Sequence, residues 1–160
     1  MADSAYIDGL KMLGRRELSE AQLRQRLAKR GHDDEAIETA VSRLKADRSV
    51  DDARVAGAIA RSETSLRKRG KLRVKRRIEA AGIAPSTAQR AVDETFLDID
   101  GDALIAAALD KRLRGRTHIE DEREFQRLYR YLAAQGFESD RILTLLRRLQ
   151  GTSRRAPERT

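Results

Sequence analysis

Apolar residues recur along this chain at intervals of three and four positions, with polar residues between them. This spacing is typical of amphipathic helices, because it places the apolar side chains on one face. Three pairs illustrate it: Leu23 with Leu27, Val74 with Ile78, and Leu128 with Leu132. A glycine follows each pair, at positions 31, 82 and 136, so the glycines are 51 and 54 residues apart. Because glycine readily ends a helix in the left-handed conformation, the pattern predicts one supersecondary unit used three times.

Each of these glycine-terminated helices is predicted to lie between two others. The preceding helices are expected from about Ser4 to Arg16, after Asp52 and after Asp102, and the following helices near Asp33, Pro85 and Ser139. On the first helix, Tyr6, Leu10 and Leu13 form the expected apolar side. Two capping boxes, Ser19 to Gln22 and Thr117 to Glu120, are expected to open the middle helices of the first and third copies.

The predicted fold is therefore all-α, with three tandem three-helix repeats in an elongated array whose curvature the sequence leaves open. The expected domains are residues 1–49, residues 50–99 with the basic character, residues 100–150, and a flexible tail at residues 151–160. No segment shows the alternation typical of a strand. A three-helix DNA-binding domain repeated by chance is the alternative interpretation, and the even spacing of the glycines disfavours it.

Composition excludes several kinds of chemistry. The chain has no cysteine and only two histidines, His32 and His118, which lie in different repeats. The acidic run from Asp98 to Asp102 resembles the start of a calcium loop, but its glycine is misplaced and Leu109 stands where the last carboxylate should be. We therefore expect a protein without enzyme activity, cofactor or metal. No apolar run approaches the length of a membrane span, so we expect a protein of the cytoplasm with no membrane contact. We also expect a monomer, although no pattern in the sequence reports the oligomeric state.

The net charge of +8 is concentrated in one stretch, residues 61–77. That stretch holds a single acidic residue, Glu63, whereas cations and anions balance over the rest of the chain. Its nine cations are Arg61, Arg67, Lys68, Arg69, Lys71, Arg73, Lys75, Arg76 and Arg77. Such a patch attracts polyanions, which include DNA, RNA and an acidic groove on a protein. Because no aromatic residue is interleaved with these cations, contact with a backbone is favoured over base stacking.

Several short runs occur in an order that resembles the RecX family, the regulators of the RecA recombinase. They are Arg16–Gly31, Asp51-Asp52-Ala-Arg54-Val55-Ala56, the basic segment 67–78, Ala81-Gly82-Ile83, and Tyr131-Leu132-Ala-Ala-Gln-Gly136-Phe137. The residues that carry the family motifs are Asp51, Asp52, Arg54, Gly82, Gly136 and Phe137. The chain departs from the family pattern in three places: Val55 replaces a Phe, Leu72–Val74 replaces a Gly-Pro context, and Gln135 replaces an Arg.

The resemblance implies a binding protein of DNA repair, homologous recombination and the SOS response. Such a protein lies in the groove of the filament that RecA forms on single-stranded DNA, and inhibits ATP hydrolysis, strand exchange and filament growth. The nine cations of residues 61–77 are then the expected partner-binding residues, with direct contact to single- or double-stranded DNA left open. Two alternatives remain: a helical module that binds nucleic acid by itself, and a structural adaptor that holds another protein in apolar grooves.

Overall fold

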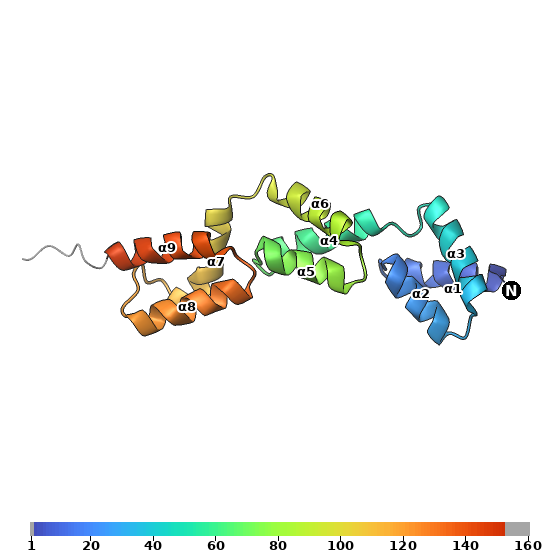
Figure 1. The fold of residues 1–160 in the computed structure, drawn as a ribbon, viewed down its shortest axis with the longest axis horizontal. Coiled ribbons are helices and arrows are strands. Elements are labelled where there is room, and N and C mark those ends of the chain that lie inside the picture. Colours follow the sequence, from blue (N-terminus) through green and yellow to red (C-terminus); the bar gives the residue numbers. More distant parts are fainter. Residues whose placement is uncertain (1, 153–160) are drawn as a thin grey trace, which may run out of the picture. The chain divides into compact units, whose positions relative to one another are not determined.

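The structure, a computed structural model, describes residues 2–152, and these residues form nine α-helices and no strand. Figure 1 shows the helices in chain order. Their bounds are α1 Ala2–Arg15, α2 Glu20–Lys29, α3 Asp34–Ala46, α4 Asp52–Ser65, α5 Lys71–Ala80, α6 Pro85–Phe96, α7 Gly101–Leu113, α8 Glu122–Ala134 and α9 Ser139–Thr152. The all-α prediction is confirmed, and the predicted tandem three-helix repeats agree with this order. None of the helices in this described part is long and apolar enough to cross a membrane.

The helices pack into two compact units. The N-terminal unit holds the chain up to Ala60 together with Lys75–Asp93, and the C-terminal unit holds Arg61–Val74 together with the chain from Glu94 onward. The division falls within α4 and within α5, so the second predicted repeat contributes to both units. The repeat boundaries at residues 49 and 99 stay a prediction. Helix α9 includes residues 151 and 152 of the predicted tail, and residues 153–160 lie outside the described part.

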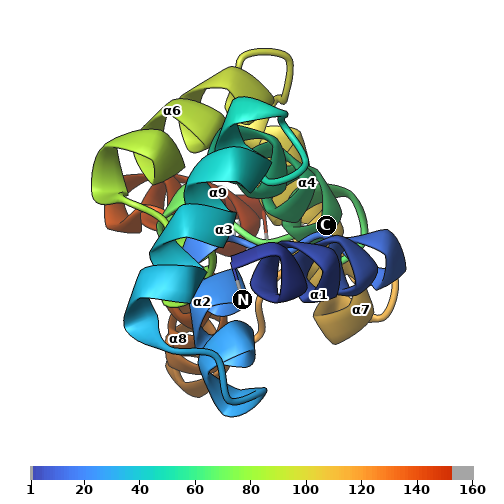
Figure 2. The ribbon, with the colours of Figure 1, turned by 90° about the vertical axis from the view of Figure 1, so that its right-hand side faces the viewer.

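The core of the N-terminal unit forms where α1, α2 and α3 meet, and Figure 2 shows α1 lying against α3. Its buried residues are Leu18, Leu23, Leu27, Ile37, Val41, Leu44 and Val50. The predicted apolar side of α1 needs a correction, because Leu10 is exposed whereas Ala5 and Gly9 are buried. A Cβ at Gly9 would lie 2.7 Å from Cδ1 of Leu44, so α3 approaches too closely for a large side chain on that face.

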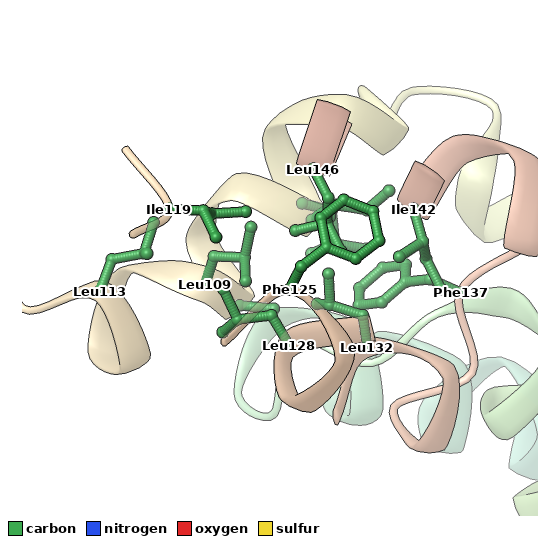
Figure 3. Packing of buried hydrophobic residues seen from close by; sticks show 12 residues of the cluster. Leu109, Leu113, Ile119, Phe125, Leu128, Leu132, Phe137, Ile142 and Leu146 are labelled. Atoms are coloured by element: carbon green, nitrogen blue, oxygen red, sulfur yellow. The ribbon is translucent and has the colours of Figure 1, made fainter. Parts of the chain in front are cut away.

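The core of the C-terminal unit includes two phenylalanines (Figure 3). Phe125 comes from α8 and the motif residue Phe137 follows the end of that helix; both pack among aliphatic residues of α7, α8 and α9. The labelled aliphatic partners are Leu109, Leu113, Ile119, Leu128, Leu132, Ile142 and Leu146. Burial of so many large side chains is the main stabilising contribution expected in this unit.

Local signals at the helix ends are mostly confirmed. Gly31, Gly82 and Gly136 have φ of 95°, 80° and 95°, as the left-handed C-cap requires. Ser19 and Gln22 form the predicted capping box of α2. The box predicted from Thr117 is wrong, because α8 begins four residues later with Asp121 as its N-cap. The connection before it is held in a non-helical form, with Glu120 N–H donating to the Glu124 carboxylate at 2.8 Å.

Candidate partner-binding surface

Helix α5, which carries five of the nine predicted partner-binding cations, begins where α8 ends. Gly70 N–H donates to the carbonyl of Gln135 at 2.9 Å, and Leu72 N–H donates to the carbonyl of Gly136 at 3.1 Å. The first N–H groups and last carbonyl groups of a helix lack partners within it, so each helix end satisfies the other. A Cβ added to Gly70 would lie 2.6 Å from the carbonyl carbon and oxygen of Gly136. We call this contact the α8–α5 joint.

The predicted cation Arg73 belongs to this joint. Its Nη1 donates to the carbonyl of Ala134 at 3.2 Å and lies 3.4 Å from Oε1 of Gln135. A Cβ at Gly136 would lie 2.3 Å from the backbone nitrogen of Arg73. Arg73 therefore stabilises the end of α8 in the way that cations at helix C-termini do.

The other end of α5 meets α2 within the N-terminal unit, and we call this contact the α5–α2 joint. The fully buried Ser19 accepts a hydrogen bond from Gln22 N–H at 3.1 Å through Oγ, and the same hydroxyl donates to the carbonyl of Ala81. A Cβ at Gly82 would lie 2.4 Å from Cβ of Ala21. Both joints therefore bring the N-terminus of one middle helix to the glycine that ends another.

Replacing Ser19 with alanine tests the α5–α2 joint. The variant loses the N-cap of α2 and leaves the carbonyl of Ala81 without its donor, so we expect unfolding free energy to fall by about 1–3 kcal/mol. Urea unfolding measures the loss. Ser42→Ala, at an exposed position within α3, is the control and should change stability by less than about 0.5 kcal/mol. Equal effects of the two changes would contradict the assignment of Ser19.

The motif residues Asp51, Asp52 and Arg54 fix the start of α4 against the first repeat. Asp51 accepts from Arg54 N–H at 3.1 Å and thereby caps α4. Asp52 accepts from Glu20 N–H at 2.8 Å, at the positive N-terminal end of α2. Burial raises the pKa of the Asp52 carboxyl.

The Arg54 guanidinium binds three different groups of the first repeat. It lies 3.0 and 3.4 Å from the two carboxylate oxygens of Glu17, and it donates to the carbonyls of Arg48 and Ser49 at 3.0 and 3.2 Å. Asp51, Asp52 and Arg54 therefore have a structural role, because they hold the start of α4 to the first repeat within the N-terminal unit.

Four cations of residues 61–77, besides Arg73, have neighbours in the C-terminal unit. Arg69 forms a close ion pair with Glu63, whose side chain is only 7% exposed. Arg67 lies 4.0 Å from the same carboxylate, and Lys68 donates to the carbonyl of Ser65 at 2.8 Å. Lys71 stacks over Phe96, with Nζ 5.6 Å from the ring centre. The single acidic residue of the stretch, Glu63, is therefore paired mainly with Arg69, and the Arg67 side chain is mostly exposed.

The remaining cations point to solvent. Arg61, on α4, and Arg76 and Arg77, on α5, are exposed and have no ion pair or hydrogen-bonded side-chain partner among residues 2–152. Lys75 has only a loose pair with Glu79, at 3.8 Å on the same helix. Unpaired guanidinium groups on a rigid helix are suited to bidentate contact with carboxylates or phosphates.

Two residues that the sequence offered as candidates for chemistry, His32 and Asp100, have structural contacts. Of the two histidines, His32 bonds through Nε2 to Asp8 at 2.8 Å, so it ties the end of α2 to α1. Asp100, from the run that resembled a calcium loop, caps α7 by accepting from the N–H groups of Asp102 and Ala103. Across the described part of the chain, no three His, Asp or Glu side chains gather closely enough to hold a metal ion.

Comparison with known proteins decides the family. The model of the first three-helix domain of RecX matches residues 5–44. The regulatory protein RecX of Clostridioides difficile is 32% identical over 152 residues, which cover 92% of this chain and 70% of that protein. The regulatory protein RecX of Halorhodospira halophila is 31% identical over 134 residues, which cover 83% and 80% of the two chains. The chain belongs to the RecX family.

Solved structures agree on the fold of this RecX-family chain. A crystal structure of RecX from Lactobacillus salivarius superposes with a TM-score of 0.82 at 17% identity, covering 92% of this chain and 96% of that chain. A second crystal structure, of a regulatory protein RecX, gives a TM-score of 0.74 and covers 92% of this chain and 71% of that one. The relatives are named as regulatory proteins, which agrees with the expected binding role.

Two features escaped the sequence analysis. The first is the long-range contacts of Gly70 and Ser19 at the joints, because their partners are far away in the chain; Ser19 was expected only as the cap of its own helix. The second is a set of cations around hollows on the surface of the third repeat, which the charge count did not reveal because cations and anions balance outside residues 61–77. A helical projection of residues 122–134 would have shown part of the second set, because Arg123, Arg127 and Arg130 fall on neighbouring turns of α8.

Proposed function

We propose that this RecX-family protein binds the RecA filament on single-stranded DNA and lowers its ATP hydrolysis, strand exchange and growth. Family membership supports the proposal, since the relatives are regulatory proteins and the resemblance to RecX implies RecA as the partner. The protein acts as a cytoplasmic monomer without enzyme activity of its own. Binding alone is sufficient for inhibition, because a ligand that prefers one filament state shifts the balance between states.

The exposed, unpaired cations in residues 61–77 are the observation that indicates which residues contact the filament. The guanidinium groups of Arg61, Arg76 and Arg77 have no partner within the described residues, and crowding of like charges costs stability unless a partner compensates it. Arg69 and Arg73 serve the fold, because their guanidinium groups bind Glu63 and the end of α8. Arg61, Arg76 and Arg77 are thus the leading candidates for contact with the filament.

The direct test mixes the protein with RecA filaments assembled on single-stranded DNA and follows ATP turnover. We expect turnover to fall as the protein is added and to reach a plateau at saturation. Unchanged turnover at saturating protein would overturn the proposed function.

Charge reversal on α5 tests the contact residues. The double variant Arg76→Glu and Arg77→Glu should weaken filament binding by at least about tenfold, because it replaces two attractive contacts with repulsive ones. The matched control is Arg26→Glu with Lys29→Glu, two exposed residues on α2 that change the net charge equally. Equal weakening by both variants, measured as the concentration for half-maximal inhibition, would show that overall charge decides and that α5 makes no special contact.

The alternative, a helical module that binds nucleic acid by itself, makes a different prediction. It requires tight, salt-sensitive binding to bare DNA and no effect on ATP turnover beyond competition for the DNA. Inhibition of RecA filaments already assembled on saturated DNA would exclude it.

A further inference from the structure

The third repeat carries a cationic hollow that is separate from residues 61–77. It has a volume of about 590 Å³ and lies against the end of α7, the connection that follows, and α8. This volume is within the usual range of ligand sites. Five cations line it, Lys111, Arg112, Arg114, Arg116 and Arg127, against the single carboxylate of Glu124.

Glu124 does not neutralise the hollow, because Arg116 holds it. Arg116 forms a close bidentate pair with Glu124 and lies 3.4 Å from Glu120. The Arg116 guanidinium and the N–H of Glu120 hold the pKa of Glu124 at about 2, so its carboxylate remains ionised and bound. The other four cations of the hollow form no close ion pair among the described residues, although the charge of Arg127 also helps to lower the pKa of Glu124.

One of these free cations is already positioned for a ligand. The Arg112 guanidinium stacks on the Tyr131 ring, with its central carbon 4.2 Å from the ring centre. A stacked guanidinium keeps the N–H groups at its edge available and has lost part of its conformational freedom before a ligand arrives.

A second hollow adjoins the first along α8. It has a volume of about 350 Å³ and is lined by Arg123, Arg127 and Arg130 together with Glu122 and Gln126. Because Arg127 lines both hollows, the cations follow α8 from Arg123 to Arg130, over about two turns. The combined surface offers charge over a length that a single small anion does not use.

The helix dipole explains the presence of only some of the cations that line the two hollows. Lys111 and Arg112 lie in the last turn of α7, where cations gain about 0.3–1 kcal/mol from the helix dipole. Arg127 lies in the middle of α8 and gains nothing from that effect.

We infer that the two hollows form one binding site for the phosphodiester backbone of a nucleic acid. Leu128 and Tyr131 are the only apolar residues that line the first hollow, and only charged and polar residues line the second, where their aliphatic stems supply most of the exposed surface. A nucleic acid has a charge at every nucleotide and binds through such cations, whereas tight binding of a peptide depends on an apolar anchor in a desolvated pocket. Contacts of this kind carry no base specificity.

The test measures binding of a fluorescent single-stranded oligothymidine, and of a duplex, by anisotropy over a range of salt concentrations. It uses the full chain without recombinase, so its outcome does not bear on the proposed filament inhibition. The double variant Lys111→Gln with Arg127→Gln should weaken single-strand binding by about tenfold and reduce the log–log salt slope by about 1.4, as expected for two lost phosphate contacts. Glutamine keeps the helix propensity near that of lysine and arginine.

The control is Arg141→Gln with Arg147→Gln, which removes the same charge from exposed positions of α9 outside both hollows. We expect less than about a twofold loss for the control, since it changes only the long-range field. Equal losses in both variants would overturn the inference, and so would failure of the unmodified chain to bind either oligonucleotide. Polyglutamate and inorganic triphosphate are tested as competitors at the same total charge as unlabelled oligonucleotide. If polyglutamate competes as well as the oligonucleotide, the site binds an acidic peptide; if triphosphate does, it binds a small phosphate ligand, and either result would overturn the inference.

Discussion

Gly136→Ala should lower the unfolding free energy of the C-terminal unit by about 2–4 kcal/mol, which corresponds to a fall in melting temperature of about 8–30 °C for a unit of this size. Two effects add. The left-handed backbone at φ 95° is strained for any residue with a Cβ, at a cost of about 1–2 kcal/mol. The new Cβ would also lie 2.3 Å from N and 2.4 Å from Cβ of Arg73, so the α8–α5 joint must open.

Gly31 provides a matched control for this change. It ends α2 as Gly136 ends α8, it has the same φ of 95°, and no atom lies within 4 Å of a Cβ built there. Gly31→Ala therefore carries the backbone cost alone, about 1–2 kcal/mol. The difference between the two melting temperatures, followed by far-ultraviolet circular dichroism, isolates the contribution of the joint. Equal losses at Gly31 and Gly136 would show that the joint contributes nothing.

The second large effect is expected at Glu124. Glu124→Gln should lower stability near neutral pH by about 1–3 kcal/mol, because it removes a buried carboxylate that accepts from Arg116 and from Glu120 N–H. This expected loss of stability is smaller than the difference between the folded pKa of Glu124, about 2, and its ordinary value of 4.5 would give. The reason is that the Arg116 side chain is a third exposed, so solvent screens the ion pair.

The pH dependence of this effect has a definite sign. The folded-state pKa of Glu124 is about 2, below its ordinary value of 4.5. Its contribution is therefore complete above about pH 5, declines as the unfolded chain takes up the proton, and is lost below about pH 2. Urea unfolding at about pH 6 and about pH 3 should show the difference between the original chain and Glu124→Gln falling to less than half at the lower pH.

Glu120→Gln is the control for the acid effect. Glu120 pairs with the same Arg116 at 3.4 Å, but its side chain is 65% exposed, so its removal should cost less than about 0.5 kcal/mol. A loss at Glu124 as small as the loss at Glu120, or one independent of pH, would contradict the role assigned to Glu124.

Features that depend on neighbouring residues were predictable from the sequence. A glycine after an apolar run ends a helix by its own backbone freedom, so Gly31, Gly82 and Gly136 marked all three middle helices correctly. Ser19 and Gln22 cap α2 by contacts three residues apart. Thr117 misled because the same pattern occurs in the connection before α8, where Asp121 supplies the cap instead.

Features that depend on distant residues were not predictable. Leu10 was expected in the core, but the close approach of α3 selects Gly9 for that face. The basic stretch was found by counting charge, yet its separation into structural and exposed cations required the partners of Arg69 and Arg73. The hollow at Arg127 was missed because acidic residues near it in sequence balance the count, whereas in space Glu124 is occupied by Arg116.

The α8–α5 joint has a consequence for how the protein tolerates evolutionary change. Two of its hydrogen bonds use only main-chain N–H and carbonyl groups, which every sequence possesses, and one comes from the Arg73 side chain. Its strictest demand is the absence of a side chain at two positions, 70 and 136. A connection of this kind survives extensive substitution around it, so the fold can persist while most of the surface diverges.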